Sequence, residues 1–202
     1  MNELNKMFSE SNSAAEYAKA YSAYLAKLTS ELDYNAISQF VDLLLSTREK
    51  GKTVYFVGNG GSAATASHFA NDLAIGTRCP ELPFKVVSLT DNVPVLTAIG
   101  NDFGYDQLFV KQLEVYMQKG DVLVAISASG NSPNIIKAVE FANAMDNASV
   151  GLTGFDGGKL KAICKHAIHV QTNKGEYGPV EDVHMFLDHL IMTYLSERIR
   201  KQ

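Results

Sequence analysis

Hydroxyl side chains cluster in one short segment, Ser127-Ala128-Ser129-Gly130-Asn131-Ser132, directly after an apolar run at 122–126. Pro133 follows the segment, and proline favours the first turn of a helix. A helix cap needs only one side chain, so three serines exceed that need. Hydroxyl and backbone donors at a helix N-terminus can bind phosphate without Lys or Arg. The segment therefore predicts a neutral phosphate-binding loop.

A second loop, Gly58-Asn59-Gly60-Gly61-Ser62, follows the apolar run at 53–57. Its glycines let the backbone turn tightly and come close to a ligand. The glycine spacing fits neither the dinucleotide fingerprint nor the P-loop, and no Lys follows. Two interpretations stay open: an anion site at a helix start, or a plain strand-to-helix turn that Ser62 caps.

Ionisable side chains recur at helical spacing in two segments. His68 and Asp72 are four residues apart, which places them on one face of a helix. A C-terminal helical segment carries Glu181, Asp182, His184, Asp188 and His189. Imidazole nitrogens and carboxylate oxygens suit zinc or a similar divalent ion. The same groups could instead form an acid/base pair without metal, or a structural ion pair.

The elements that must position these residues alternate between short apolar runs and helical periodicity. The predicted strands are 53–57, 84–89, 122–126, 149–152 and 167–170. The predicted helices between and after them are 62–75, 105–118, 132–145 and 180–200, and Asp102 is read as a helix cap. This alternation predicts an α/β fold, a doubly wound, five-stranded parallel sheet flanked by helices. Ligands bind beyond the carboxyl ends of such strands, where both loops lie.

Residues 13–50 form a helical segment with a break near 33–35. Tyr17, Tyr21 and Tyr24 recur there at three- and four-residue spacing. This surface is more aromatic than a solvated arm needs, so we expect it to pack on the core or on another subunit. We therefore expect one domain over 1–202, with N-terminal helices at 1–50 and an α/β core with a C-terminal helix at 51–202.

Bulk properties narrow the class of protein. The chain has 202 residues, is 46% hydrophobic and carries a formal charge of −4, which argues against nucleic-acid binding. Its two isolated cysteines, Cys79 and Cys164, indicate reduced thiols and a cytoplasmic location. No apolar run approaches the roughly 20 residues of a membrane helix, and residues 1–10 lack the pattern of a signal peptide.

The combination of segments resembles the sugar isomerase (SIS) domain family, and within it the phosphoheptose isomerases. The matching pieces are Gly58 to Ser62 with His68-Phe69-Ala70, Gly100 to Tyr105, Ser127 to Ser132, Leu152-Thr153-Gly154, and His184 with His189. The resemblance runs from the N-terminal helices almost to the C-terminus. It implies the SIS fold and conversion of sedoheptulose 7-phosphate to D-glycero-D-manno-heptose 7-phosphate, for lipopolysaccharide or capsule heptose.

The resemblance also implies roles for individual positions. Residues at the sugar-phosphate site would be Asn59, Gly60, Gly61, Ser62 and Glu181. The sugar would contact Asn101 and Asp102, and the phosphate would contact Ser127, Ala128, Ser129 and Ser132. One zinc ion per site would be bound by His68, Asp72, Glu181 and His189, and Asp72 and His189 would be catalytic. Family precedent implies a homotetramer with sites near subunit interfaces.

Two positions depart from the family pattern. The family has Glu where this chain has Asp72, and Gln where this chain has Glu181. Asp is one methylene shorter, and a misplacement of about 1 Å can lower a rate by about 10²-fold. The two departures therefore leave open which phosphosugar is the substrate and whether Asp72 or Glu181 is the base, but they do not alter the expected fold. Two other functions stay open: a non-catalytic SIS protein that binds the replication initiator, and a sugar-phosphate sensor.

Overall fold

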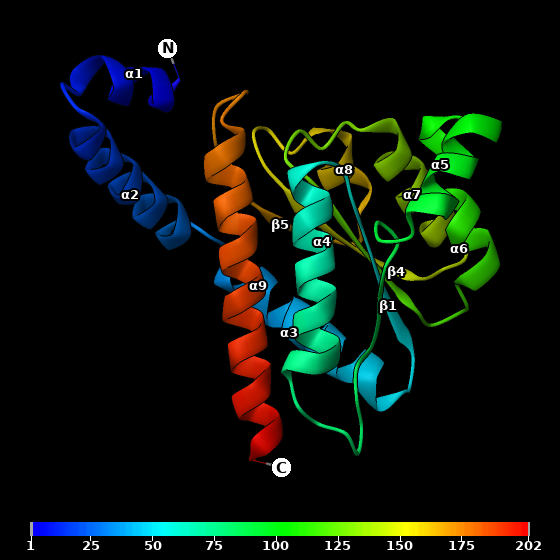
Figure 1. The fold of residues 1–202 in the computed structure, drawn as a ribbon. Helices are drawn as coiled ribbons and strands as arrows, with labels where there is room; N and C mark the ends of the chain where they lie inside the picture. Colours follow the sequence, from blue (N-terminus) through cyan, green and yellow to red (C-terminus); the bar gives the residue numbers. More distant parts are fainter. Residues whose placement is uncertain (1, 202) are drawn as a thin grey trace.

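A five-stranded parallel sheet forms the centre of the molecule in the computed structural model, which describes residues 2–201 (Figure 1). The strands are β1 (Thr53–Gly58), β2 (Lys85–Ser88), β3 (Val122–Ser127), β4 (Ala148–Thr153) and β5 (His166–His169). Their order across the sheet is β2-β1-β3-β4-β5. Each predicted strand matches to within one residue at either end, which confirms the predicted sheet.

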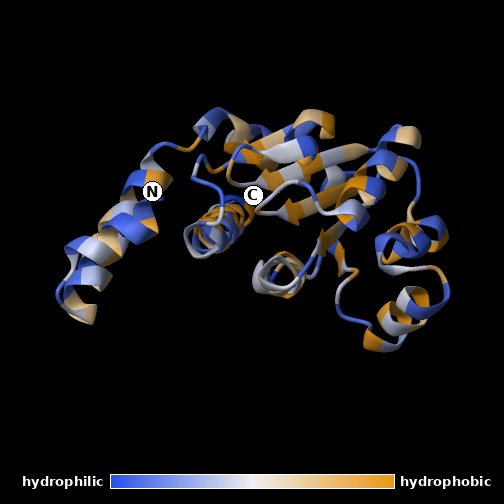
Figure 2. Cartoon of the chain, turned by 90° about the horizontal axis from the view of Figure 1, so that it is seen from above, coloured by the Kyte–Doolittle hydropathy of each residue, from blue (hydrophilic) through white to orange (hydrophobic). Residues whose placement is uncertain are grey.

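Helices cover both faces of the sheet. One face packs against α3 (Tyr34–Glu49), α4 (Gly61–Asn71) and α9 (Tyr177–Arg200). The other packs against α5 (Val93–Asp102), α6 (Val110–Tyr116), α7 (Pro133–Ala144) and α8 (Gly158–Ile163). Successive side chains of a strand alternate between these two cores, as Tyr55 and Phe56 do in β1. The central strands β1, β3 and β4 are therefore mostly apolar and buried, and the sheet is largely orange in Figure 2.

The strand order places a topological switch point between β1 and β3. The chain leaves β1 toward β2 on one side of the sheet, and it leaves β3 toward β4 on the other. Connections that diverge in this way open a crevice at the carboxyl ends of the two central strands. The loops that follow these strands are 58–62 and 127–132, the two that sequence reasoning selected.

The N-terminal helices α1 (Glu3–Glu10) and α2 (Ala14–Ser30) extend away from the sheet (Figures 1 and 2). Two tyrosines of α2 nevertheless attach it to the start of α9. Tyr21 Oη donates to Asp182 Oδ2 at 2.6 Å, and Tyr24 Oη donates to Glu176 Oε2 at 2.7 Å. The buried Glu176 carboxylate also accepts the backbone N–H of Glu3 at 2.6 Å. These contacts join α2 to the core at the start of α9, and packing of the rest of α1 and α2 on another subunit stays a prediction.

Several helices differ from the prediction. The predicted helix over 105–118 is instead a 3₁₀ turn, η2 (Tyr105–Gln107), followed by α6, and α5 and α8 had no predicted counterpart. Helix α5 contains proline, glycine and β-branched residues, so packing against the core rather than propensity stabilises it. Asp102 is the last residue of α5, whose cap is Asn92, so the predicted capping role of Asp102 is wrong.

Helix α4 continues past Asn71 into a π-helical turn, η1 (Asp72–Gly76), so the predicted segment 62–75 is helical throughout but changes its winding at Asp72. Such turns are rare in proteins and frequently occur at functional sites. Within residues 2–201, the structure has no helix that combines the length and the apolar character needed to cross a bilayer.

Candidate active site

The Ser127–Ser132 loop connects β3 to α7 and is tightly folded. The backbone N–H of Gly130 donates to the carbonyl oxygen of Ser127 at 3.1 Å and to its Oγ at 3.2 Å. Gly130 has a φ of +63°, and a Cβ there would overlap the carbonyl oxygen of Gly157. Ser132 precedes the first residue of α7, but its side chain does not cap the helix. Its Oγ lies 3.5 Å from Ser127 Oγ, and both serines line the same cavity.

A cavity of about 160 Å³ lies between this loop and the start of α4. Its lining residues are Asn59, Ser62, Ile126, Ser127, Ala128, Ser129, Ser132, Tyr177 and Glu181. Helix α4 also begins without a side-chain cap, because Gly60 occupies the capping position, so the interpretation of Ser62 as the cap is wrong. Two helix N-termini without side-chain caps thus meet one cavity with their positive dipole ends, an arrangement suited to an anion.

Asn59 joins the glycine loop to the start of α7. Its Nδ2 donates to Asn134 Oδ1, and Asn134 Nδ2 donates back to Asn59 Oδ1, both at 2.9 Å. Tyr105 Oη donates to the same Asn59 oxygen at 3.0 Å. Asn134 is buried, so this pair of amides fixes the separation of the two loops. Asn59 also lines a second cavity, of about 360 Å³, on the side of α5.

Asn101 and Asp102 lie at the exposed end of α5. Asn101 Nδ2 donates to Asp102 Oδ1 at 2.8 Å. Neither residue lines either of the two cavities beside Asn59. Within one chain, the structure therefore does not bring them together with the serine loop.

Four potential metal ligands meet where α4 and α9 run side by side (Figure 1). His68 and Asp72 come from α4 and its π-helical turn, and Asp188 and His189 come from α9. The Nε2 atoms of the two histidines are 3.2 Å apart. His68 Nε2 lies 3.6 Å from Asp72 Oδ2 and 4.0 Å from Asp188 Oδ2. All four residues offer ligand atoms within 4.8 Å of one another.

The donors in this group fit a divalent ion such as zinc. Two facing imidazole nitrogens can share a proton or can bind the same cation, and two carboxylates complete a set of four ligands. Asp188 is fully buried, and neither of its carboxylate oxygens has a hydrogen-bond partner among the described residues. Burial, together with the nearby Asp72 carboxylate, raises the pKa of Asp188 to about 7. A buried carboxylate without a partner is unfavourable, and a cation would compensate it.

Glu181 belongs to the serine cavity rather than to this group. Eight residues of α9 separate it from His189, which is about 12 Å along a helix axis. Its carboxylate packs against Gly61, where a Cβ would overlap it, and burial followed by the Asp182 charge raises its pKa. The geometry of one chain therefore does not support the predicted role of Glu181 as a ligand of the same ion. The additional carboxylate in the group, Asp188, was not among the predicted site residues.

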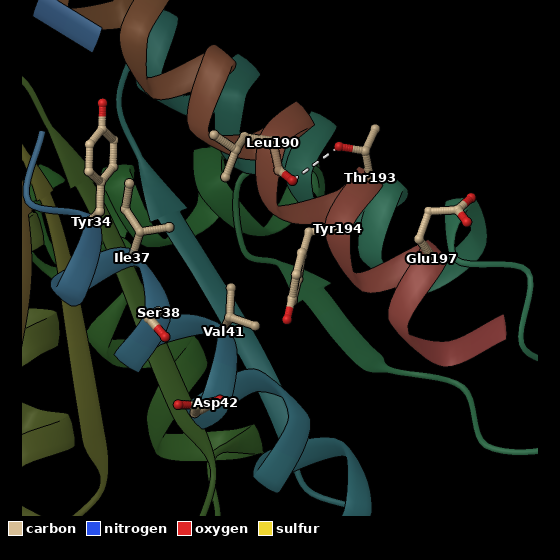
Figure 3. A pocket seen from close by; sticks show the side chains of 9 residues that line it. All are labelled: Tyr34, Ile37, Ser38, Val41, Asp42, Leu190, Thr193, Tyr194 and Glu197. Atoms are coloured by element: carbon tan, nitrogen blue, oxygen red, sulfur yellow. Dashed lines mark hydrogen bonds between the residues drawn. The ribbon is translucent and has the colours of Figure 1, made fainter. Parts of the chain in front are cut away.

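A larger cavity, of about 580 Å³, lies apart from these residues, between α3 and α9 (Figure 3). Its lining residues are Tyr34, Ile37, Ser38, Val41, Asp42, Leu190, Thr193, Tyr194 and Glu197. None of them is a predicted site residue, and most of the lining is apolar. Volume alone therefore does not select the candidate active site, because the smaller serine-lined cavity has the polar lining that a sugar phosphate requires.

Comparisons with known proteins agree with this fold. The family model of the SIS domain matches residues 16–154. The phosphoheptose isomerase of Aliarcobacter butzleri is 36% identical over 157 residues, 78% of this chain and 82% of that protein. The phosphoheptose isomerase of Rhodospirillum rubrum is 38% identical over 164 residues, which are 81% of this chain and 86% of that protein. The solved phosphoheptose isomerase of Neisseria gonorrhoeae has a TM-score of 0.81 at 33% identity, over 92% of this chain and 100% of that chain.

These matches cover most of both partners in each comparison. The fold and the serine cavity define a phosphosugar-binding α/β protein. The chain belongs to the SIS-domain family and, within it, to the phosphoheptose isomerases.

Proposed function

We propose that this protein is an aldose–ketose isomerase that converts sedoheptulose 7-phosphate to D-glycero-D-manno-heptose 7-phosphate. The observation that carries the proposal is the convergence of two uncapped helix N-termini on one serine-lined cavity. Similarity to phosphoheptose isomerases over most of the chain selects the heptose among phosphosugars. The same similarity favours an enzyme over a binder of the replication initiator or a sugar-phosphate sensor. The product would supply heptose for lipopolysaccharide or capsule.

The phosphate is held by groups that need no positive side chain. Ser127, Ser129 and Ser132 offer hydroxyls, and the starts of α4 and α7 offer backbone N–H groups. Gly60 and Gly61 keep the backbone of the glycine loop accessible, and Asn59 lies between the two cavities. Ala128 completes the wall, while Ser62 and Glu181 face the remainder of the sugar phosphate.

The reaction moves a proton from C1 to C2 through an enediol. Asp72 takes the carbon-bound proton and returns it to the neighbouring carbon, and His189 moves the proton between the two oxygens. His68, Asp72 and His189 would hold a zinc ion, which when bound supplies polarisation of the carbonyl. Helix α4 connects the phosphate site to this group, because Ser62 and His68 lie about 9 Å apart along its axis.

Asp72→Asn should lower kcat by at least ~10²-fold, because the amide cannot accept the proton, while the sugar phosphate still binds. Glu181→Gln should retain turnover and bind the sugar phosphate at least as tightly, since it removes a carboxylate from the phosphate cavity. Aldose formation from a panel of ketose phosphates, followed by NMR with and without zinc, measures turnover, and calorimetry measures binding.

Two results would change this assignment. Normal turnover by Asp72→Asn would exclude Asp72 as the base. Loss of turnover confined to Glu181→Gln would assign the base to Glu181, and activity on no ketose phosphate would refute the isomerase.

The same family membership supports a proposal for the oligomeric state and the location. We infer a cytoplasmic homotetramer of one SIS domain per chain, with sites near subunit interfaces. Exposed aromatic side chains, including Phe8, Tyr34 and Tyr194, support burial against other copies. The exposed position of Asn101 and Asp102 supports their contributing to a site in another subunit.

A further inference from the structure

Asp188 is the one member of the His/Asp group that cannot reach a substrate. Its side chain is fully buried, whereas Asp72 is 16% exposed and His68 is 45% exposed. The nearest positive or ligating partner of its carboxylate is His68 Nε2, at 4.0 Å from Oδ2. Both carboxylate oxygens lack hydrogen-bond donors among residues 2–201. Burial of such a group is unfavourable unless a cation or donor compensates it.

The fold leaves little else for this carboxylate to do. It lies inside the interface of α4 and α9 and makes no ion pair with Lys or Arg among the described residues. A structural role would be better served by an apolar side chain of similar volume. Only a ligand role toward the group that also contains His68, Asp72 and His189 uses both its charge and its position.

The proposed function assigns two tasks to Asp72, binding the ion and moving the carbon-bound proton. A carboxylate bound to a divalent cation is a weaker base, so the two tasks compete. We propose that Asp188 is a fourth ligand of the ion in this chain and the carboxylate that holds it most firmly. Two carboxylates and two imidazoles then balance a divalent charge, and the more exposed Asp72 can turn toward the substrate. This inference rests on the proposed function for the presence of the ion.

Zinc affinity of the metal-free full chain, measured by competition with a chromophoric chelator, tests the proposal without any activity readout. Asp188→Asn and Asp188→Leu should each bind zinc at least ~100-fold more weakly than the wild-type chain. Asp72→Asn should weaken zinc binding less than either Asp188 variant. Glu197 is an exposed carboxylate on the same helix as Asp188, and Glu197→Gln should leave the zinc affinity unchanged.

The melting temperature gives an independent test, because Asp188→Leu should raise it without zinc and should lower it relative to the wild-type chain with zinc. Without metal, Asp188→Leu should melt above the wild-type chain by ~4 °C or more, because a buried unpaired charge is gone. With saturating zinc, the wild-type chain should gain in melting temperature and the variant should not.

Wild-type zinc affinity in both Asp188 variants, or a larger loss in Asp72→Asn than in Asp188→Asn, would overturn the proposal. So would a wild-type chain that takes up no zinc. If zinc binding depends on Asp188 but no ketose phosphate is isomerised, the ligand assignment stands and the proposed reaction fails.

Discussion

Buried polar side chains of α9 face different partners although they lie within two helical turns. His184 and Asp188 are both fully buried and are four residues apart. Asp188 faces the other residues of the His/Asp group, whereas His184 Nε2 lies 3.4 Å from the carbonyl oxygen of Thr153. The Nδ1 atom of His184 has no partner among the described residues. His184 is therefore buried away from the His/Asp group, and its burial should make the stability of the protein depend on pH.

Burial lowers the pKa of His184 to about 4, from an ordinary value of 6.5. Between these values the unfolded chain binds a proton at this residue and the folded chain does not. The free energy of unfolding should therefore fall as the pH decreases from about 6.5 to about 4, by roughly 3 kcal/mol from this residue. Urea unfolding at several pH values measures this free energy. It should depend less steeply on pH in this range for His184→Gln than for the wild-type chain. Equal slopes for the two proteins would contradict the assignment.

At the scale of elements, the serine loop depends on one glycine that sequence reasoning did not distinguish from its neighbours. Gly130 combines a positive φ with a backbone contact to Gly157, and the N–H of Leu160 donates to the carbonyl oxygen of Gly130 at 2.9 Å. The loop is thus fixed against the start of α8, two elements further along the chain. Its shape is determined by this contact as well as by its own hydroxyl groups.

Gly130→Ala should therefore lower the free energy of unfolding by more than ~2 kcal/mol, or displace the loop so that phosphate binding is lost. Gly51→Ala is the matched control, because Gly51 has the same φ of +63° but only Lys85 Nζ, at 3.9 Å, near a Cβ. Gly51→Ala measures only the cost of placing alanine at a positive φ, which is about 1–2 kcal/mol. Denaturant unfolding and titration with sugar phosphate compare the two. Equal losses for both variants would show that the contact with Gly157 is unimportant.

At the scale of the whole molecule, the separation of Asn101 and Asp102 from the serine cavity bears on assembly. If another subunit contributes these residues, the protein must be an oligomer, and light scattering should give four times 22.0 kDa, about 88 kDa. A monomer would exclude shared sites. The apolar cavity between α3 and α9 and the extended α1–α2 arm are the surfaces that assembly could cover (Figures 1 and 3).

Complementation tests the sharing directly. Asp72→Asn and Asp102→Ala should each have low activity alone. When they are unfolded and refolded together, a tetramer with shared sites should regain activity at about a quarter of its sites, because those sites receive both wild-type residues. Refolding each variant separately before mixing is the control. No recovery in the mixed tetramer would place both residues in a site formed by one chain.

The sequence alone determined the sheet, because parallel strands covered on both faces are apolar without interruption and are separated by helical periodicity. It also predicted a phosphate-binding loop, because serines, a glycine and Pro133 are local signals that do not depend on distant contacts. Family motifs then supplied the reaction class. Helices such as α5, which lack strong propensity, could not be predicted because packing against the core stabilises them.

Only the tertiary structure decided which carboxylates meet. In the sequence, Glu181 and Asp188 are equivalent candidates on one helix, seven residues apart. The packing of α9 against α4 brings Asp188 to His68 and sets Glu181 beside Gly61. Spacing along a helix fixes which residues share a face, but the neighbouring helix decides what each residue contacts. The composition of the His/Asp group is therefore a property of the folded chain.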